Sequence, residues 1–482
     1  MNGTAPALDP ALRQREVGSF AIDSRDVKPG DVFFALSQPE YRENGFNGDF
    51  EDSTRYVPGA LDKGAVACVL RRDRLEEHRS ELEGLANRLI FVDDVIKALQ
   101  DLAHSVYLAW DKPVVAITGS AGKTTARELT AHVLRSHGLK VLSNIKNYNN
   151  GLGHPITVLN LAGDSSYDVA VLEMGMSTPM NEIQRLCRIT PPDMAVELNV
   201  LPVHLEHLGS IENIAAAKAE LVENMKDGGT AVLNADDERV IAMKGSSRGK
   251  TVTYGIENEA DVRARDIGFE SFGQTSFNLS INGIDADVNF PLNGRHNILN
   301  ALAAAAVGST FGMTIDEIAQ SLATVAPPPQ RGEILRFKAG FIVINDSYNS
   351  NPAALLSMTD TLVNGSRDAK RKIVVAGEML ELGPDEKDIH RQTGAAVASS
   401  GADMLIGVRG LAKELVDGAR DAGLQSAEFA ADSDAAADIL LENIAVGDAV
   451  LVKGSRGVKT ERIIERLLDK FDLEEKRAAN NG

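Results

Sequence analysis

Short apolar runs alternate with amphipathic stretches along most of the chain. Four such runs in the first hundred residues are bounded by Gly, Pro or charged positions: 19–22, 31–36, 65–70 and 88–92. Runs of this length predict strands, and the helical pattern that follows them ends near Trp110. The first part of the sequence therefore predicts a small α/β module.

Lys112-Pro113 interrupts the chain, and a second alternation of strands and helices begins behind it. The apolar run 114–117 leads into a glycine-rich loop and a helical pattern over 124–137, which Gly138 would cap. Further elements are predicted as strands at 168–173, 194–199 and 230–234, a helix at 211–225, a β-rich stretch at 252–290 and an Ala-rich helix at 297–311.

Pro327-Pro328-Pro329 predicts a stiff linker, because proline fixes φ. Strands and helices alternate again beyond it, with strands predicted at 341–345, 372–376, 404–408 and 449–453. Such alternation indicates a mostly parallel sheet covered on both faces. We therefore predict an α/β protein of three domains: a small N-terminal α/β module (1–112), a central domain with a mostly parallel sheet (113–328) and a Rossmann-like C-terminal domain (329–482).

The composition is that of a globular protein and excludes several kinds of partner. The 482 residues carry a formal net charge of −19 without a basic run, so no nucleic-acid partner is expected. No stretch approaches the roughly 18 consecutive apolar residues of a membrane span. We therefore expect no membrane insertion and a cytoplasmic protein. Cys68 and Cys187 lie far apart in apolar surroundings, which is typical of buried free thiols.

The segment Gly119-Ser120-Ala121-Gly122-Lys123-Thr124-Thr125 joins the predicted strand 114–117 to the helix behind it. In such a loop the backbone N–H groups turn toward an anion, and the helix N-terminus adds positive potential. Lysine and threonine then supply a cation and a metal-binding hydroxyl. A full Walker A motif would have glycine in place of Ile117, so this is the shorter G-x-x-G-K-T form. It predicts an ATP-using enzyme.

Glu173 and Lys218 are candidates for metal chemistry. Glu173 ends an apolar strand where a phosphate-loop protein places its acidic Mg²⁺ ligand, although such a residue can also simply mark the exit to solvent. Lys218 shares a helical stripe with apolar residues, so a bare ammonium there would be costly unless neutralised, paired or modified. The alternative is a lysine at the edge of the stripe whose charged end reaches water.

His204 and His207 follow the predicted strand 194–199. Their spacing differs from H-E-x-x-H and no third ligand is nearby, which argues against a zinc site. His204 is a candidate neighbour of Mg²⁺ or phosphate, and a structural loop histidine is the alternative.

In this order, these features resemble the Mur ligases over about residues 15–470. The glycine loop matches the ATP loop of the family, Glu173 its metal-binding glutamate, and His204 the histidine of its N-x-x-x-x-H-L signature. Lys218 falls on the lysine that the family carbamylates, and a carbamate would turn a buried cation into an anion able to bind Mg²⁺. The resemblance implies ATP and Mg²⁺ as cofactors, with Lys123, Glu173, His204 and Lys218 as catalytic residues and Thr124, Glu173, His204 and carbamylated Lys218 as metal ligands.

The resemblance also places the nucleotide and the substrates. It implies that His296, Asn297 and Asn300 seat adenine, that Arg331 lies near the phosphates, and that Asp346 binds the ribose. The segment 346–352 resembles that of the members that add a terminal dipeptide. The implied substrate contacts are Ser24 and Arg25 near uridine, Asn147 and Asn150 in the segment 147–153, and Tyr348, Asn349, Lys453, Ser455 and Arg456 in the C-terminal domain. On the uridine side, the segment 46–50 lacks the histidine of the common D-G-H-D-F version.

By the same resemblance, the enzyme joins D-alanyl-D-alanine to UDP-N-acetylmuramoyl-tripeptide through an acyl phosphate, as part of peptidoglycan precursor synthesis. The N-terminal, central and C-terminal domains would hold the UDP-linked substrate, ATP and the dipeptide, in a monomer. A folylpolyglutamate-synthetase-like enzyme would read closer to D-G-A-H-N-P at 346–352. A switch GTPase would need a guanine-reading N-K-x-D segment, which the sequence lacks. A non-catalytic nucleotide-binding scaffold stays open on motifs alone.

Overall fold

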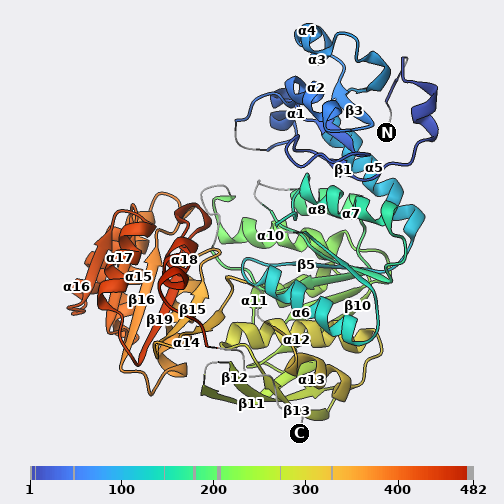
Figure 1. Ribbon diagram of the computed structural model, residues 1–482. Coiled ribbons are helices and arrows are strands. Elements are labelled where there is room, and N and C mark those ends of the chain that lie inside the picture. Colours follow the sequence, from blue (N-terminus) through green and yellow to red (C-terminus); the bar gives the residue numbers. More distant parts are fainter. Residues whose placement is uncertain are drawn as a thin grey trace.

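The structure is a computed structural model that describes residues 3–5, 7–46, 49–145, 147–176, 181–202, 208–271, 273–326 and 329–474. The chain forms three lobes, and each lobe is built on its own sheet (Figure 1). The three sheets fall within the three predicted domains, which confirms the α/β class and the three-part architecture. The boundaries at 112 and 328 stay predictions.

A four-stranded parallel sheet forms the N-terminal domain. Its strands lie side by side in chain order: β1 (Phe20–Ala21), β2 (Val32–Ala35), β3 (Ala67–Arg71) and β4 (Leu89–Val92). The helices are α1 (Gln38–Glu43), α2 (Val57–Asp62), α3 (Arg74–Glu77), α4 (Arg79–Leu82) and α5 (Val95–Trp110). Asp94 caps α5 by accepting from the Lys97 N–H, and Asp111 ends it in the left-handed conformation. All four predicted strands are confirmed.

The central domain contains a nine-stranded sheet in the order β13-β12-β11-β10-β9-β8-β5-β7-β6. Its strands are β5 (Val114–Thr118), β6 (Val141–Ser143), β7 (Val169–Glu173), β8 (Met194–Glu197), β9 (Thr230–Asn234), β10 (Lys250–Gly255), β11 (Val262–Ser271), β12 (Gln274–Ile281) and β13 (Ile284–Phe290). The pairs β11–β12 and β12–β13 are antiparallel, and the other neighbouring strands of this sheet pair in parallel. Because β5 lies between β7 and β8, the glycine loop at its carboxyl end is flanked by the ends of both neighbours.

Helices cover both faces of this sheet, as the predicted alternation requires. They are α6 (Lys123–Ser136), α7 (Gly153–Gly163), α8 (Glu182–Ile189), α10 (Ile211–Glu223), α11 (Glu238–Ala242), α12 (Arg295–Thr310) and α13 (Ile315–Ala323). Side chains of α6 and α12 pack in one core with Val196 of β8, whereas those of α8 and α10 pack in another with Ala195. Successive residues of a strand point to opposite faces. The fully buried strand β8 therefore faces a helix on either side.

The C-terminal domain is a six-stranded sheet in the order β14-β15-β19-β16-β17-β18, parallel except for the edge strand β14. Its strands are β14 (Glu333–Arg336), β15 (Ile342–Asp346), β16 (Arg371–Gly377), β17 (Met404–Val408), β18 (Ala427–Ala430) and β19 (Asp448–Lys453). The helices are α14 (Pro352–Gly365), α15 (Glu386–Ser399), α16 (Ala412–Asp421), α17 (Ser433–Asn443) and α18 (Glu461–Lys470). Buried clusters lie on both faces of the sheet, as a doubly covered sheet requires.

Both cysteines are free and buried, as predicted from their apolar surroundings. Burial raises the pKa of the Cys68 thiol to about 12, so it is an unreactive packing residue. Among the described residues, no helix combines the length and apolar character needed to cross a membrane.

His154 gives the central domain a pH-dependent stability. Its ring is fully buried on α7, Nε2 lies 2.7 Å from Thr190 Oγ1, and burial lowers the pKa from 6.5 to about 3. Between these two values the unfolded chain binds the proton and the folded chain does not, so stability falls as the pH drops below 6.5. Urea unfolding at about pH 7 and about pH 5 measures this effect in the protein and in His154→Gln. The free energy of unfolding should fall more between the two pH values in the unmodified chain than in the variant. Equal losses in the two proteins would contradict this assignment.

Candidate active site

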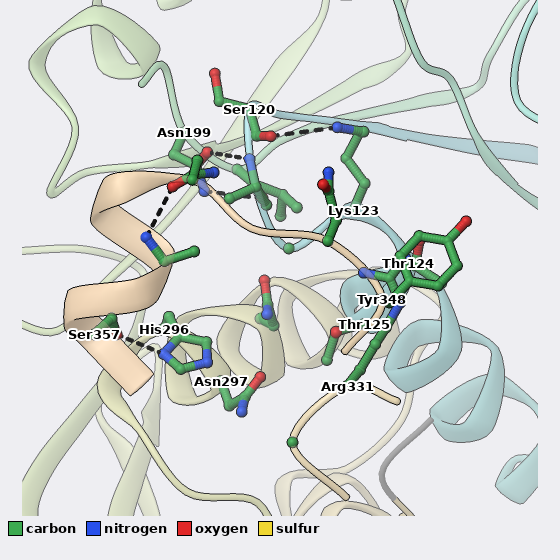
Figure 2. Close-up of a pocket in the computed structure, with 18 of the residues that line it drawn as sticks. Ser120, Lys123, Thr124, Thr125, Asn199, His296, Asn297, Arg331, Tyr348 and Ser357 are labelled. Carbon is green, nitrogen blue, oxygen red and sulfur yellow. Dashed lines mark hydrogen bonds between the residues drawn. The ribbon is translucent and has the colours of Figure 1, made fainter. Parts of the chain in front are cut away.

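A cavity of about 430 Å³ lies between the central and C-terminal domains (Figure 2). Its walls come from the glycine loop, the N-terminal part of α12 and the segment that follows β15. The predicted site residues that line it are Ser120, Ala121, Gly122, Lys123, Thr124, Thr125, Asn147, Glu173, His296, Asn297, Asn300, Arg331, Asp346, Tyr348, Asn349 and Lys453. Residues from two domains, far apart in sequence, thus surround one space.

Hydrogen bonds to Asn199 fix the conformation of the glycine loop. Sequence reasoning had not singled out this residue. Asn199 Oδ1 accepts from the Ala121 N–H at 2.9 Å, and its backbone oxygen accepts from the Ser120 N–H at the same distance. Lys123 Nζ donates to the Gly119 carbonyl at 2.8 Å and points toward Ser120 (Figure 2). Burial lowers the pKa of Lys123, while the negative charge of Glu173 opposes that shift. Gly119 belongs to this loop but does not line the cavity.

Gly122 is required by both conformation and space. Its φ is +84°, and an added Cβ would lie 2.7 Å from Asn300 Oδ1. The loop 119–125, which we call the phosphate cradle, needs this close approach, because its backbone N–H groups must face the ligand.

Gly122→Ala is therefore expected to weaken ADP binding by about tenfold or more, because the added methyl group would collide with Asn300 and displace the loop, and a loss of about 1.4 kcal/mol in binding free energy is a factor of ten. Gly138→Ala is the matched control, because its φ is +87° and its Cβ would meet nothing within 4 Å. Calorimetric titration with ADP tests the pair. Equal affinities for the two variants would contradict a role of Gly122 in the phosphate cradle.

Glu173 is fixed on both carboxylate oxygens. Thr124 Oγ1 donates to Oε2 at 2.8 Å, and Asn149 Nδ2 donates to Oε1 at 2.7 Å. Arg127 Nη1 lies 3.7 Å from Oε2, and both side chains are nearly inaccessible to solvent. Thr124 and Glu173 thus present hard oxygen donors beside the phosphate cradle, a donor set that fits Mg²⁺ bound jointly with a nucleotide.

The segment 147–153 divides its roles differently from the prediction. Asn147 and Asn149 line the cavity, and only Asn149 contacts Glu173. Asn150 Oδ1 accepts from the Gly153 N–H at 2.9 Å and does not line the cavity. Because adjacent asparagines read alike in a sequence, nothing in the motif indicates which of them turns inward.

Lys218 is buried on α10, with 2% of its surface exposed. The alternative of a lysine whose end reaches water is therefore wrong. The pKa of Lys218 is lowered to about 7, chiefly by burial and also by the positive charge of Lys123, while the negative charge of Glu197 opposes the shift. Lys218 does not line the cavity. His204 and His207 lie outside the described residues, so the expectations for them stay predictions.

The nucleotide-side residues of α12 contact the C-terminal domain. His296 Nδ1 lies 3.0 Å from Ser357 Oγ of α14, and burial lowers the pKa of His296 to about 4 (Figure 2). Asn297 Nδ2 donates to the Asn293 carbonyl at 2.7 Å. A neutral imidazole at this position suits a neutral ring such as a nucleobase.

The C-terminal wall gathers cations around one aromatic ring. The Arg331 guanidinium carbon lies 4.0 Å from the centre of the Tyr348 ring, and that of Arg456 lies 5.5 Å from it. Lys453 Nζ pairs with Asp346 at 2.6 Å and donates to the Asn349 carbonyl at 2.8 Å. These positive charges suit the negative phosphates and carboxylates of a substrate.

The remaining predicted contacts lie outside the cavity lining. Ser455 Oγ accepts from the Leu380 N–H at 3.1 Å, and Arg456 lies over the ring of Tyr348, which lines the cavity. Ser24 and Arg25 belong to the N-terminal domain, where Arg25 pairs with Asp23 and Lys63 donates to the Ser24 carbonyl. The structure therefore leaves the uridine contacts as predictions.

The chain is similar to proteins of one family over nearly its whole length. Residues 117–308 match the Mur ligase middle domain, and residues 330–456 match the Mur ligase glutamate ligase domain. The UDP-N-acetylmuramoyl-tripeptide--D-alanyl-D-alanine ligase of Bacillus subtilis (strain 168) is 30% identical, with 96% of this chain and 95% of that protein covered. The enzyme of the same name from Escherichia coli (strain K12) is 31% identical, with 97% and 96% covered.

A solved structure extends this likeness to the fold. The MurF ligase of Thermotoga maritima in complex with ADP superposes with a TM-score of 0.80 at 27% identity, with 96% of this chain and 99% of that chain covered. The chain therefore belongs to the Mur ligase family, in its MurF group.

Proposed function

We propose that this enzyme uses ATP to join D-alanyl-D-alanine to UDP-N-acetylmuramoyl-tripeptide in peptidoglycan precursor synthesis. The observation that carries the proposal is the composition of the cavity. The phosphate cradle of the central domain faces the same space as the C-terminal wall, which includes Tyr348 and Lys453. An activated carboxylate and an amine can therefore meet there. The names of relatives that match almost the whole chain supply the identity of the two substrates.

The proposed chemistry has two steps. A carboxylate oxygen of the tripeptide attacks the γ-phosphorus of ATP, the bond to the β-phosphate oxygen breaks, and ADP leaves with an acyl phosphate formed. The amine nitrogen of the dipeptide then attacks the acyl carbon, phosphate leaves with the former carboxylate oxygen, and the nitrogen loses a proton. Lys123 and the loop N–H groups stabilise the charge on the transferred phosphoryl group, so catalysis rests on positioning and electrostatics.

Metal ions would neutralise the phosphates in this site. Thr124 and Glu173 would hold one Mg²⁺, because their oxygens already meet beside the cradle. A second Mg²⁺ would be held by His204 and carbamylated Lys218. The carbamate forms when the Lys218 amine attacks CO₂ and a proton leaves. Among the described residues, no three His, Cys, Asp or Glu side chains converge.

The substrates would divide between the domains. His296, Asn297 and Asn300 would seat adenine, and Asp346 would bind the ribose. Tyr348, Asn349, Lys453, Ser455 and Arg456 would receive the dipeptide and the end of the tripeptide, with Asn147 and Asn150 beside them. Ser24 and Arg25 would contact the uridine end. Since a single chain carries all these groups, we propose that the enzyme works as a monomer. We place it in the cytoplasm together with the precursor synthesis that it serves.

A phosphate-release assay tests the proposal and its alternatives together. Rapid phosphate release is expected only when ATP, UDP-N-acetylmuramoyl-tripeptide and D-alanyl-D-alanine are all present. Release from GTP alone would indicate a switch GTPase, no release in any mixture would indicate a scaffold, and release with a folate substrate and glutamate would indicate a folylpolyglutamate synthetase. Any of these results would overturn the proposed reaction.

A further inference from the structure

Glu197 is a buried acid at the edge of the active site that the proposed chemistry does not use. It is the last residue of β8, paired in register with Thr118 at the end of β5. Ala195, two residues earlier, packs in the core under α10, and alternate residues of a strand share a face. Glu197 therefore faces α10, the helix that carries Lys218. Glu173 ends β7, which lies on the other side of β5. Its side chain faces α6, where it accepts a hydrogen bond from Thr124.

Among the residues that the structure describes, the carboxylate of Glu197 has no hydrogen-bond partner. Its exposed fraction is 0%, and neither oxygen finds a donor within the described part of the chain. Another fully buried acid, Glu40, behaves in the usual way, because its two oxygens accept from the Ser37 and Val95 N–H groups. A buried carboxylate without partners is costly, and native proteins keep one where a bound ion or a catalytic task compensates for it.

The charges around Glu197 point to a cation. Burial raises the pKa of Glu197 well above its ordinary range, and the positive charges of Lys218 and Lys123 oppose that shift. Asp237 adds a second negative charge nearby. If Lys218 becomes a carbamate, its positive charge is replaced by a negative one, and Lys123 is then the one remaining cation of the two that act on Glu197. A divalent metal ion would restore the balance.

We propose that Glu197 is a carboxylate ligand, direct or through water, of the divalent cation that carbamylated Lys218 binds. This assignment rests on the proposed function, because it requires the modified lysine. It adds to that site an oxygen donor from the strand next to the phosphate loop. Such a ligand explains why a fully buried carboxylate is kept without a donor partner at this position.

Binding of Mn²⁺ to the whole protein, followed by electron paramagnetic resonance in the presence of ADP and bicarbonate, tests the proposal. The unmodified chain should bind two Mn²⁺ ions. Glu197→Gln, the neutral isostere, should keep the first and bind the second about 10- to 100-fold more weakly, the loss typical of altered metal surroundings. Glu40→Gln is the matched control for removing a buried acid and should bind both ions normally. Carbon NMR with ¹³C-bicarbonate should show the carbamate signal in the unmodified chain.

The other outcomes separate this inference from the proposed function. A second Mn²⁺ bound equally well by Glu197→Gln would overturn the role of Glu197 as a ligand. A carbamate signal without a second Mn²⁺ in the unmodified chain would also overturn it, and so would the absence of a carbamate signal. In each case the phosphate-release assay still decides whether the chain is the proposed ligase.

Discussion

Replacing Lys218 with alanine should reduce dipeptide ligation by about 10³-fold or more, the scale on which lost electrostatic stabilisation slows catalysis. The side chain is buried on α10 and does not line the cavity, so ADP should still bind with nearly unchanged affinity. The measurement is the ligation rate together with ADP affinity and thermal unfolding, which show whether the fold survives the deletion.

Chemical rescue distinguishes a missing carboxylate from a damaged core. Added acetate or another short carboxylate should restore part of the activity of Lys218→Ala, because it can occupy the place of the carbamate. Full activity of Lys218→Ala without added bicarbonate or carboxylate would contradict the carbamate role.

Replacing Lys123 with methionine should lower the ligation rate by about 10³-fold, since removal of a preorganised phosphate-stabilising charge costs at least that much in comparable enzymes. Lys123 lines the cavity, and its Nζ donates to the Gly119 carbonyl of its own loop. Methionine keeps the apolar part of the side chain, so the fall in the ligation rate measures the contribution of the positive charge.

Lys140→Met is the matched control, because Lys140 lies in the same domain with its side chain 48% exposed and paired with Asp164. Its ligation rate should stay within about twofold of normal, as expected of exposed ion pairs. A loss in Lys140→Met equal to that in Lys123→Met would show that the effect is not specific to the phosphate cradle.

The sequence predicted the elements whose signals are local. Buried parallel strands such as β5, β7 and β17 read as continuous apolar runs, and the glycine loop combines a fixed spacing with a strand before it and a helix behind it. Three strands were not predicted: β6, β14 and β18. Each has only three or four residues, and its pairing is decided by the neighbouring strand rather than by its own pattern. The observed helix ends also differ from the predicted ones. The helix predicted at 211–225 ends at Glu223, and the helix predicted at 297–311 begins at Arg295.

In the candidate site too, the residues of local motifs were predicted, and residues whose role depends on a neighbouring element were missed. The motif residues around the phosphate cradle line one cavity, whereas their roles toward the nucleotide and the substrates stay predictions. Asn149, Asn199 and Glu197 were missed, since their roles depend on which side of a loop or strand meets another element. Glu197 in particular ends an apolar strand, where an acid usually marks an exit to water. Only the covering helix α10 shows that it is fully buried.

In the proposed function, the enzyme activates the tripeptide carboxylate by phosphorylation. A tripeptide labelled with ¹⁸O in the reacting carboxylate tests it directly, because attack on the γ-phosphorus keeps that oxygen on the phosphate that leaves. After complete ligation, mass spectrometry should find one ¹⁸O in each released phosphate and the other in the new amide. Unlabelled phosphate, accompanied by the same amide product, would contradict the account.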